Sequence, residues 1–199
     1  MDIQFISEDL TADQLEAAYP RGLFPMANPG EQQITWHRPR RRAVLPLDDF
    51  HVSHSLARRL RQARFTVTYD QDFAGVMHGC AERPDGTWID ARVLAAYTEL
   101  HRRGKAHSVE IWVDGALAGG VYGVHLGGAF FAESKFHRQR DMSKAALAHL
   151  VFRLRERGFA LLEVQYVTEH LKQFGVVNWP SQRYERALAV ALTLDCRFV

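Results

Sequence analysis

Three apolar, alternating segments joined by two-residue turns constrain the fold more than any other feature of this chain. The segments are SVEIWV (108–113), LAGGVYGVHL (117–126) and AFFAES (129–134). Asp114-Gly115 joins the first two, and Asp-Gly between alternating segments is a strong signal for a tight β-hairpin. Gly127-Gly128 separates the second from the third. The sequence therefore predicts a three-stranded antiparallel meander.

Helical spacing occurs on both sides of this meander, which predicts a mixed α/β fold. The expected helices are 11–19, 54–62, 72–82, 91–103, 142–157, 168–174 and 181–192, and the other expected strands are 34–36, 65–70 and 159–167. The last strand is almost continuously apolar, as is typical when both faces are covered. This order of elements is that of an acetyltransferase-like (GNAT-type) domain, in which the meander and the later strand splay apart at the acyl-donor cleft. We therefore expect an α/β (α+β) fold with a mixed sheet.

The first residues are too few for an independent core. We expect residues 1–41 to form a small N-terminal α+β subdomain, and residues 42–199 to form the acetyltransferase-like catalytic domain. The segment 19–26, YPRGLFPM, contains two prolines and a glycine, so we expect an ordered loop there, followed by a polar turn at 28–31.

Composition excludes several classes of protein. Hydrophobic residues make up 47% of the chain and charged residues 24%, which is typical of a globular protein. No apolar run reaches the roughly 20 residues that span a bilayer, and the N-terminus lacks the features of a signal peptide. We therefore expect a cytoplasmic protein without membrane contact. The two cysteines and ten histidines show no metal-ligand spacing, so we expect no metal and no cofactor.

Basic residues are concentrated in three clusters, although the net charge is only +2. The clusters are Arg38, Arg40, Arg41 and Arg42; Arg58, Arg59, Arg61 and Arg64; and Arg102, Arg103 and Lys105. Any one cluster is explained by a solvated face. Three together favour a phosphate-binding surface.

Glu163 and Gln165 are the most informative polar pair. Residues i and i+2 of a strand project from one face, so both side chains are expected on the same side of the strand 159–167. Polar groups on an interior strand must form hydrogen bonds. The pair is therefore interpreted either as a polar floor beneath a reactive centre or as a wetted strand face.

Glu133 is a second candidate, because it follows Phe130 and Phe131 at the end of an apolar strand. It could hold an ammonium group or form a salt bridge with Arg138 or Arg140. Potential nucleophiles are poorly supported, since Ser134 lacks the G-x-S-x-G context and Cys80 is isolated. Direct transfer without an acyl-enzyme is favoured, with catalysis by positioning and electrostatics.

Longer motifs go beyond a generic fold. They are YPRGLFPM (19–26), WHRPRRRAVL (36–45), FHVSHSL (50–56), GTWI (86–89), the segment 96–112 around LHRRGKAHSVE, GGVYGV (119–124), FFAESKF (130–136), SKAAL (143–147) and EVQYVTEHL (163–171). Together, from about residue 3 to residue 190, the chain closely resembles the leucyl/phenylalanyl-tRNA–protein transferases.

The resemblance implies transfer of leucine or phenylalanine from aminoacyl-tRNA to the N-terminal amine of proteins that begin with Arg or Lys, which marks them for N-end-rule degradation. An apolar pocket discriminates size by only about 1–3 kcal/mol per methylene, so methionine should be used weakly. Gln165 would be the catalytic amide, Glu163 its supporting acid, and Glu133 the contact of the donor's α-amino group.

The other implied contacts are Trp36, Trp88 at the adenosine end, and Val121, Phe130, Leu147, Leu150 and Leu162 around the donor side chain. Arg40, Arg41, Arg42, Arg58, Arg59 and Arg61 are expected to hold tRNA phosphates.

The chain departs from the family's usual pattern at the candidate site. Glu163 stands where the family usually has Asp, and the family's ESMFSR reads ESKFHR here, which introduces Lys135 and His137. Two other functions remain open at this point. One is a coenzyme-A-dependent N-acetyltransferase, although residues 138–146 lack the glycines of a pyrophosphate loop, and the other is a non-catalytic RNA- or peptide-binding module.

Overall fold

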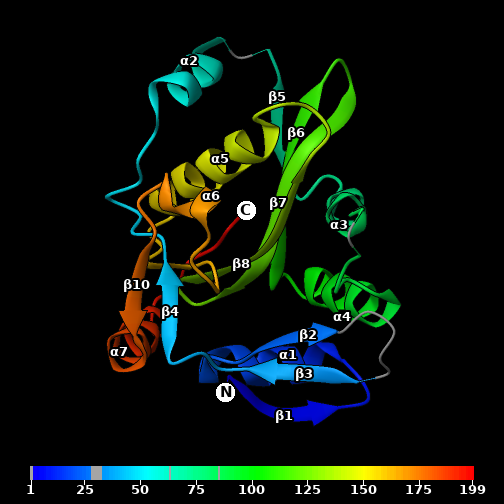
Figure 1. Ribbon diagram of the computed structural model, residues 1–199, viewed down its shortest axis with the longest axis vertical. Coiled ribbons are helices and arrows are strands. Elements are labelled where there is room, and N and C mark those ends of the chain that lie inside the picture. The colour runs from blue at the N-terminus through cyan, green and yellow to red at the C-terminus, as the bar shows by residue number, and fades with distance from the viewer. Residues whose placement is uncertain (1, 28–32, 63, 85) are drawn as a thin grey trace.

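The computed structural model describes residues 2–27, 33–62, 64–84 and 86–199, and within these ranges the strands form two sheets (Figure 1). The strands are β1 (Ile3–Ser7), β2 (Phe24–Ala27), β3 (Ile34–His37), β4 (Arg41–Val44), β5 (Thr66–Tyr69), β6 (Ala106–Val113), β7 (Ala116–Leu126), β8 (Ala129–His137), β9 (Leu161–Glu163) and β10 (Val177–Pro180). The helices are α1 (Ala12–Ala18), the 3₁₀ turn η1 (Tyr19–Arg21), α2 (His54–Gln62), α3 (Phe73–Ala81), α4 (Ala91–Arg102), α5 (Met142–Glu156), α6 (Glu169–Lys172) and α7 (Ser181–Ala191).

The small sheet has the order β1-β3-β2 and packs with α1. Thr11 begins α1 with a capping box, since its hydroxyl accepts from the Gln14 amide and the Gln14 side chain accepts from the Thr11 amide. The loop expected at 19–26 is wrong in its second half, because residues 24–27 form β2. Pro25 is tolerated there since β2 is an edge strand, where a missing N–H costs no ladder bond. The expected turn at 28–31 lies outside the described residues.

The large sheet has the order β10-β4-β9-β8-β7-β6-β5. The predicted meander is confirmed as β6, β7 and β8, which pair antiparallel. At the β6–β7 turn both Asp114 (φ 50°) and Gly115 (φ 77°) adopt left-handed conformations, as a two-residue hairpin of the favoured hand requires. β5 extends the meander at one edge.

The strands on the other side of β8, namely β9, β4 and β10, were predicted least well from the sequence. β8 and β9 pair in parallel, while β9–β4 and β4–β10 are antiparallel, so the sheet is mixed as expected. The strand expected at 159–167 is wrong beyond Glu163, because the backbone of Gln165 turns to φ 63°. β4 and β10 were not expected from the sequence. In the described structure, β8 pairs with β9 only through residues 129–131, so the two strands diverge beyond Phe131.

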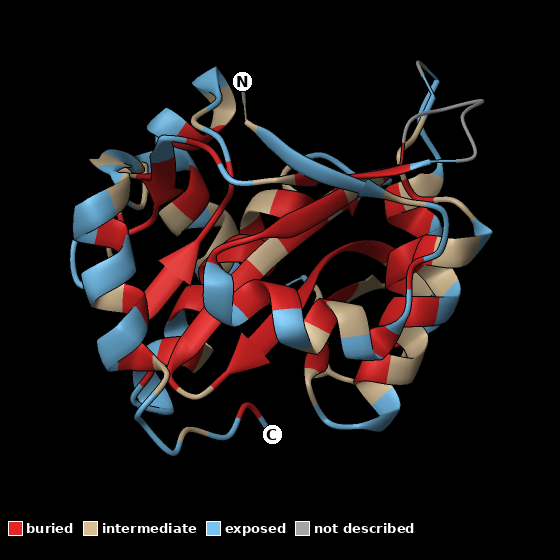
Figure 2. Ribbon diagram, turned by 90° about the horizontal axis from the view of Figure 1, so that it is seen from below, coloured by how far each residue is buried: buried red, intermediate tan, exposed pale blue. Residues whose placement is uncertain are grey.

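Two apolar clusters cover the two faces of the large sheet. Helix α5 lies on one face, and α3, α4 and the small sheet lie on the other (Figure 1). Figure 2 shows the strands buried between helices whose outer faces are exposed. The acetyltransferase-like arrangement, with a small sheet before it, is therefore confirmed. In the described part of the chain, no helix has both the length and the apolar character of a membrane span.

Candidate active site

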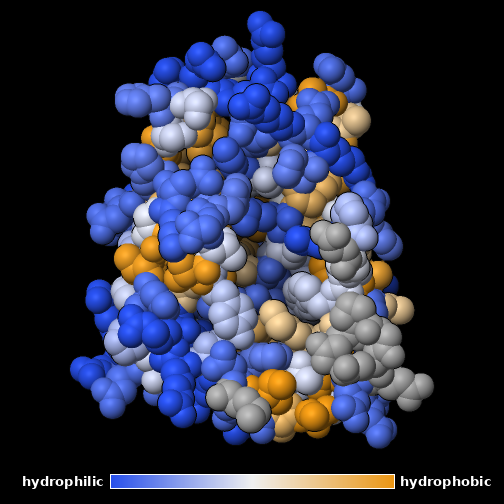
Figure 3. Space-filling view, in the orientation of Figure 1, coloured by the Kyte–Doolittle hydropathy of each residue, from blue (hydrophilic) through white to orange (hydrophobic). Residues whose placement is uncertain are grey.

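A cavity of about 200 Å³, here called the central cavity, opens where β8 and the chain after β9 diverge. Its apolar walls are Val121, Ala132, Leu147, Val164 and Leu171, and its polar groups are Glu133, Ser134, Lys135, Gln165, Tyr166 and Thr168. In Figure 3 this face of the molecule is hollowed near its centre, in the region between α6 and α3 of Figure 1.

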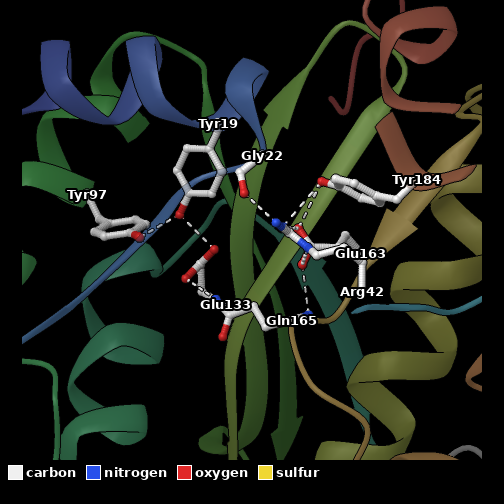
Figure 4. Close-up of polar contacts among 8 residues, drawn as sticks. All are labelled: Tyr19, Gly22, Arg42, Tyr97, Glu133, Glu163, Gln165 and Tyr184. Atoms are coloured by element: carbon white, nitrogen blue, oxygen red, sulfur yellow. Dashed lines mark hydrogen bonds and ion pairs between the residues drawn. The ribbon is translucent and has the colours of Figure 1, made fainter. Parts of the chain in front are cut away.

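A β-bulge in β8 places the Glu133 carboxylate between Tyr19 of η1 and Gln165. Tyr122 pairs with Ser134 and Gly123 with Ala132, so Glu133 is the extra residue in β8. Its carboxylate accepts a hydrogen bond from the Tyr19 hydroxyl at 2.7 Å and another from Gln165 Nε2 at 2.7 Å (Figure 4). The expected alternative, a salt bridge from Glu133 to Arg138 or Arg140, is wrong. Those arginines pair with Glu82 at 2.9 Å and Asp141 at 3.7 Å.

The Glu133 carboxyl is only 8% exposed, and this burial has an electrostatic consequence. Burial raises its pKa from 4.5 to about 8, although hydrogen bonds from Tyr19 and Gln165 oppose the rise. A cation bound beside Glu133 would favour the ionised form. The site is therefore suited to an ammonium group.

Gln165 lines the central cavity from a strained backbone position. Its φ of 63° is in the left-handed region, which is uncommon for a residue other than glycine. The Gln165 backbone N–H donates to Glu163 Oε1 at 3.1 Å, and its side-chain Nε2 donates to Glu133. One of the two Nε2 hydrogens is taken by Glu133, so Gln165 can offer a ligand its side-chain carbonyl oxygen as an acceptor and its second amide hydrogen as a donor.

Glu163 lies behind the cavity wall, so the expectation that it shares a strand face with Gln165 is wrong. It is 1% exposed and forms an ion pair with Arg42 at 2.7 Å. The Tyr184 hydroxyl donates to the same carboxylate at 3.2 Å. Glu163 therefore holds the backbone of Gln165, while Glu133 orients its amide.

The expectation for Arg42 is also wrong. It was expected to bind phosphate, but it is 2% exposed, donates to the carbonyl of Gly22 and stacks on the Tyr184 ring at 4.3 Å (Figure 4). A side chain committed to these contacts cannot reach a phosphate in solvent. Arg40, Arg41, Arg58 and Arg61 are exposed as expected, and Arg58 and Arg59 line a cleft with Arg140 and Lys144. In the third cluster, Arg103 instead ties α4 to α1 through Asp13 and Glu16.

The aromatic and aliphatic residues expected around the donor fall into two groups. Val121 and Leu147 line the central cavity. Phe130, Leu150 and Leu162 lie in the core behind it and are at most 1% exposed.

Trp36 and Trp88, the two tryptophans expected to contact the substrate, do not line the central cavity. Trp36 was expected to contact substrate, but it is buried in the small sheet, stacks on Phe5 and donates to Ser7. Trp88 packs partly buried against the cluster under α3 and α4. Its contact with adenosine remains a prediction.

Sequence reasoning missed the tyrosines of the site. Tyr19 and Tyr97 share a hydrogen bond of 2.6 Å although they are 78 residues apart, and Tyr184 reaches Glu163 from α7. Tyr19 and Tyr97 lie in the motifs 19–26 and 96–112, but no sequence feature assigned them a role, and Tyr184 lies outside the motifs. Among the described residues, no group of three or more His, Cys, Asp or Glu side chains could hold a metal ion.

Comparison with known proteins gives consistent matches. The family model "Leucyl/phenylalanyl-tRNA protein transferase" matches residues 44–189, and the model of that family's N-terminal domain matches residues 8–40. A leucyl/phenylalanyl-tRNA–protein transferase of Salinibacter ruber is 53% identical over 188 residues, which cover 94% of this chain and 83% of that protein. The protein of the same description from Gloeobacter violaceus is 50% identical over 189 residues, covering 95% and 97%. Among solved structures, a ribosomal-protein-alanine N-acetyltransferase of Brucella melitensis is similar with a TM-score of 0.39 and 20% identity, covering 55% of this chain and 84% of that one.

Proposed function

Because the chain belongs to the leucyl/phenylalanyl-tRNA protein transferase family and is an aminoacyltransferase, we propose a specific donor, acceptor and mechanism for it. The donor is leucyl- or phenylalanyl-tRNA, with methionyl-tRNA used weakly. The acceptor is the N-terminal amine of a protein that begins with Arg or Lys, which is thereby marked for N-end-rule degradation in the cytoplasm. The observation that carries this proposal is the Glu133–Gln165 hydrogen bond of 2.7 Å on the wall of the central cavity.

The donor's side chain fits the central cavity by size and polarity. A cavity of about 150 Å³ with apolar walls is known to hold benzene, which has the size of a phenylalanine ring. The central cavity measures about 200 Å³ and is walled by Val121, Leu147 and Leu171. Glu133 at its edge would then accept the donor's α-ammonium group, which stabilises the carboxylate form of Glu133.

Gln165 would orient the attacking amine. An amide is too weak a base to hold a proton, but its carbonyl oxygen accepts a hydrogen bond from the amine as the nitrogen attacks the ester carbonyl. The new C–N bond forms and the bond from that carbonyl to the ribose oxygen breaks. The proton released by the amine passes to the leaving oxygen through the neighbouring 2′-hydroxyl or water. Positioning supplies most of the catalysis in such a scheme.

Two features support attack without an acyl-enzyme. Burial raises the pKa of the Cys80 thiol to about 12, so the reactive thiolate is absent near neutral pH. The hydroxyl of Ser134 accepts a hydrogen bond from Arg83 at 3.0 Å, and a guanidinium group cannot remove a proton from it. Neither side chain has the partner that an activated nucleophile needs.

The acceptor stem of the tRNA would lie on the basic residues outside the central cavity. Arg40 and Arg41 lie beside Tyr166 at the mouth of the site, and Arg58, Arg59 and Arg61 belong to α2. Contacts from these side chains to phosphates fix position and carry no sequence information. They also make binding weaker at higher salt.

A donor-exchange assay tests this function. The protein is incubated with radiolabelled leucyl-tRNA, phenylalanyl-tRNA or acetyl-coenzyme A and a peptide that begins with Arg. We expect label to move to the peptide from both aminoacyl-tRNAs and not from acetyl-coenzyme A. Transfer from acetyl-coenzyme A alone would contradict the proposal. Retained tRNA binding without any transfer would instead indicate a binding module.

A further inference from the structure

A second cavity, of about 420 Å³, adjoins the central cavity and is not accounted for by the transfer chemistry. Three consecutive residues of β8, Glu133, Ser134 and Lys135, line both cavities. The remaining lining residues come from α3 and the segment after it, from the end of β8, and from α5 and α6: Gly79, Glu82, Arg83, Phe136, His137, Ser143 and His170. Hydrophilic atoms line much of the rim of the hollow in Figure 3.

The charges around this second cavity do not cancel. Of its two acids, Glu82 is paired with Arg138 through both carboxylate oxygens at 2.9 and 3.1 Å, and burial raises the pKa of Glu133 to about 8, so its carboxyl carries little charge near neutral pH. Arg83 and Lys135 contribute positive charge. In the described part of the chain, no acidic side chain forms an ion pair with the Lys135 ammonium. The second cavity is therefore electropositive.

The position of Lys135 follows from the β-bulge. Beyond the extra residue Glu133, Lys135 pairs with Val121 and points to the α5 face of the sheet, beside Leu147. Burial lowers the pKa of Lys135, and the charge of Arg83 lowers it further. The pKa of His170 is also lowered, by burial first and then by the charge of Lys135. Burial is the larger cause of both shifts, and the neighbouring positive charges add to it; a bound anion would oppose that second contribution.

We infer that the second cavity binds the 5′-phosphate of the donor's terminal nucleotide, with the Lys135 ammonium as its main contact and the hydroxyl of Ser143 as an additional donor. This inference rests on the proposed function. The ester oxygen and the 5′-phosphate of that nucleotide lie at opposite ends of one ribose. A donor whose amino acid fills the central cavity therefore carries its phosphate about one sugar away, and the two cavities share the wall that the ribose would cross.

The shared wall also favours the donor over the acceptor as the source of the anion. Glu133 joins the two cavities and is the group that would hold the donor's own ammonium. An anionic group that extends past Glu133 and Ser134 toward Lys135 therefore belongs to the molecule bound at Glu133. An acidic side chain of the acceptor peptide is the competing occupant.

Stable donor analogues test the phosphate contact without relying on catalysis. The dissociation constant of 3′-deoxy-3′-(leucylamino)adenosine is measured with and without a 5′-phosphate, for the wild-type protein, Lys135→Met and Lys105→Met. Lys105 immediately precedes β6 and lines neither cavity, so it provides a control that loses the same charge. In the wild type and in Lys105→Met we expect the phosphate to tighten binding by about 10-fold or more, the size of one charged hydrogen bond. In Lys135→Met that gain should disappear, so that the analogues with and without the 5′-phosphate bind equally.

Other outcomes have distinct meanings. An undiminished phosphate gain in Lys135→Met would overturn the inference. It would also be overturned if Lys135→Met kept the phosphate gain and instead raised KM only for peptides that begin with Asp or Glu, since the cavity would then serve the acceptor. If neither analogue bound the wild-type protein, the donor assignment under the proposed function would fail, and this inference with it.

Discussion

Glu133 concentrates the electrostatics of the site in one residue. The carboxyl is buried between Tyr19, which comes from the small subdomain, and Gln165, which follows β9, and it has no ion-pair partner of its own among the described residues. Folding therefore removes a carboxylate from water and offers only neutral donors in return. A cationic group of the substrate, bound beside Glu133, would offset this cost.

The raised pKa of Glu133 predicts a pH-dependent stability. The folded protein binds a proton at Glu133 more tightly than the unfolded chain does, so the penalty for ionisation appears as the pH rises above 4.5 and is complete above about 8. Urea unfolding of the wild type and of Glu133→Gln should show the wild type losing stability relative to the variant across that window. A difference that stays constant from pH 5 to pH 9 would mean that Glu133 is not destabilised by burial.

At the scale of elements, β4 holds the chain that carries Gln165. The backbone N–H of Ala43 donates to the Gln165 carbonyl at 3.2 Å, and its carbonyl accepts from Val164 at 2.9 Å. Arg42, the preceding residue, reaches Glu163 and the carbonyl of Gly22. β4 thereby connects the small subdomain, β9 and the turn at Gln165. The left-handed backbone of Gln165 persists because these contacts surround it.

Removing one partner of the buried Arg42–Glu163 pair should lower the free energy of unfolding far more than removing one partner of a surface pair. Arg42→Met leaves the Glu163 charge buried without a partner, and we expect it to lower the free energy of unfolding by about 3–5 kcal/mol. The matched control is Arg38→Met, since Arg38 also pairs with a glutamate, Glu185 at 2.7 Å, but both side chains are 44% exposed. That substitution should cost less than about 1 kcal/mol. Equal losses in urea unfolding would contradict the importance assigned to burial.

The helices and the meander could be predicted from sequence because their signals are local. The helix expected at 54–62 has those bounds, and the Asp114-Gly115 turn is where the hairpin closes. β4 and β10 could not be predicted, since each is four residues long and is defined by partners more than a hundred residues away. The end of β9 was missed for a similar reason. Its apolar residues continue to Val167, but tertiary contacts turn the chain at Gln165.

At the scale of the whole molecule, the site joins parts that the sequence alone would separate. Resemblance indicated Gln165, Glu163 and Glu133, and the structure brings Glu133 and Gln165 into contact while placing Glu163 behind them. Tyr19 and Gly22 from the N-terminal part complete the surroundings of Glu133 and Arg42. One apolar cluster runs from α1 and the small sheet to α3, α4 and β7. The N-terminal part therefore belongs to the site's framework.

The most direct test of the account is the rate of the transfer step in Gln165→Ala. Single-turnover transfer from leucyl-tRNA to a peptide is measured together with tRNA affinity, with Gln173→Ala, an exposed glutamine next to α6, as the control. We expect Gln165→Ala to slow transfer by about 100-fold or more, the size of one lost transition-state hydrogen bond, with unchanged tRNA affinity. Gln173→Ala should transfer at the wild-type rate. A Gln165→Ala protein that transfers leucine as fast as the wild type would contradict the claim that this amide orients the attacking amine.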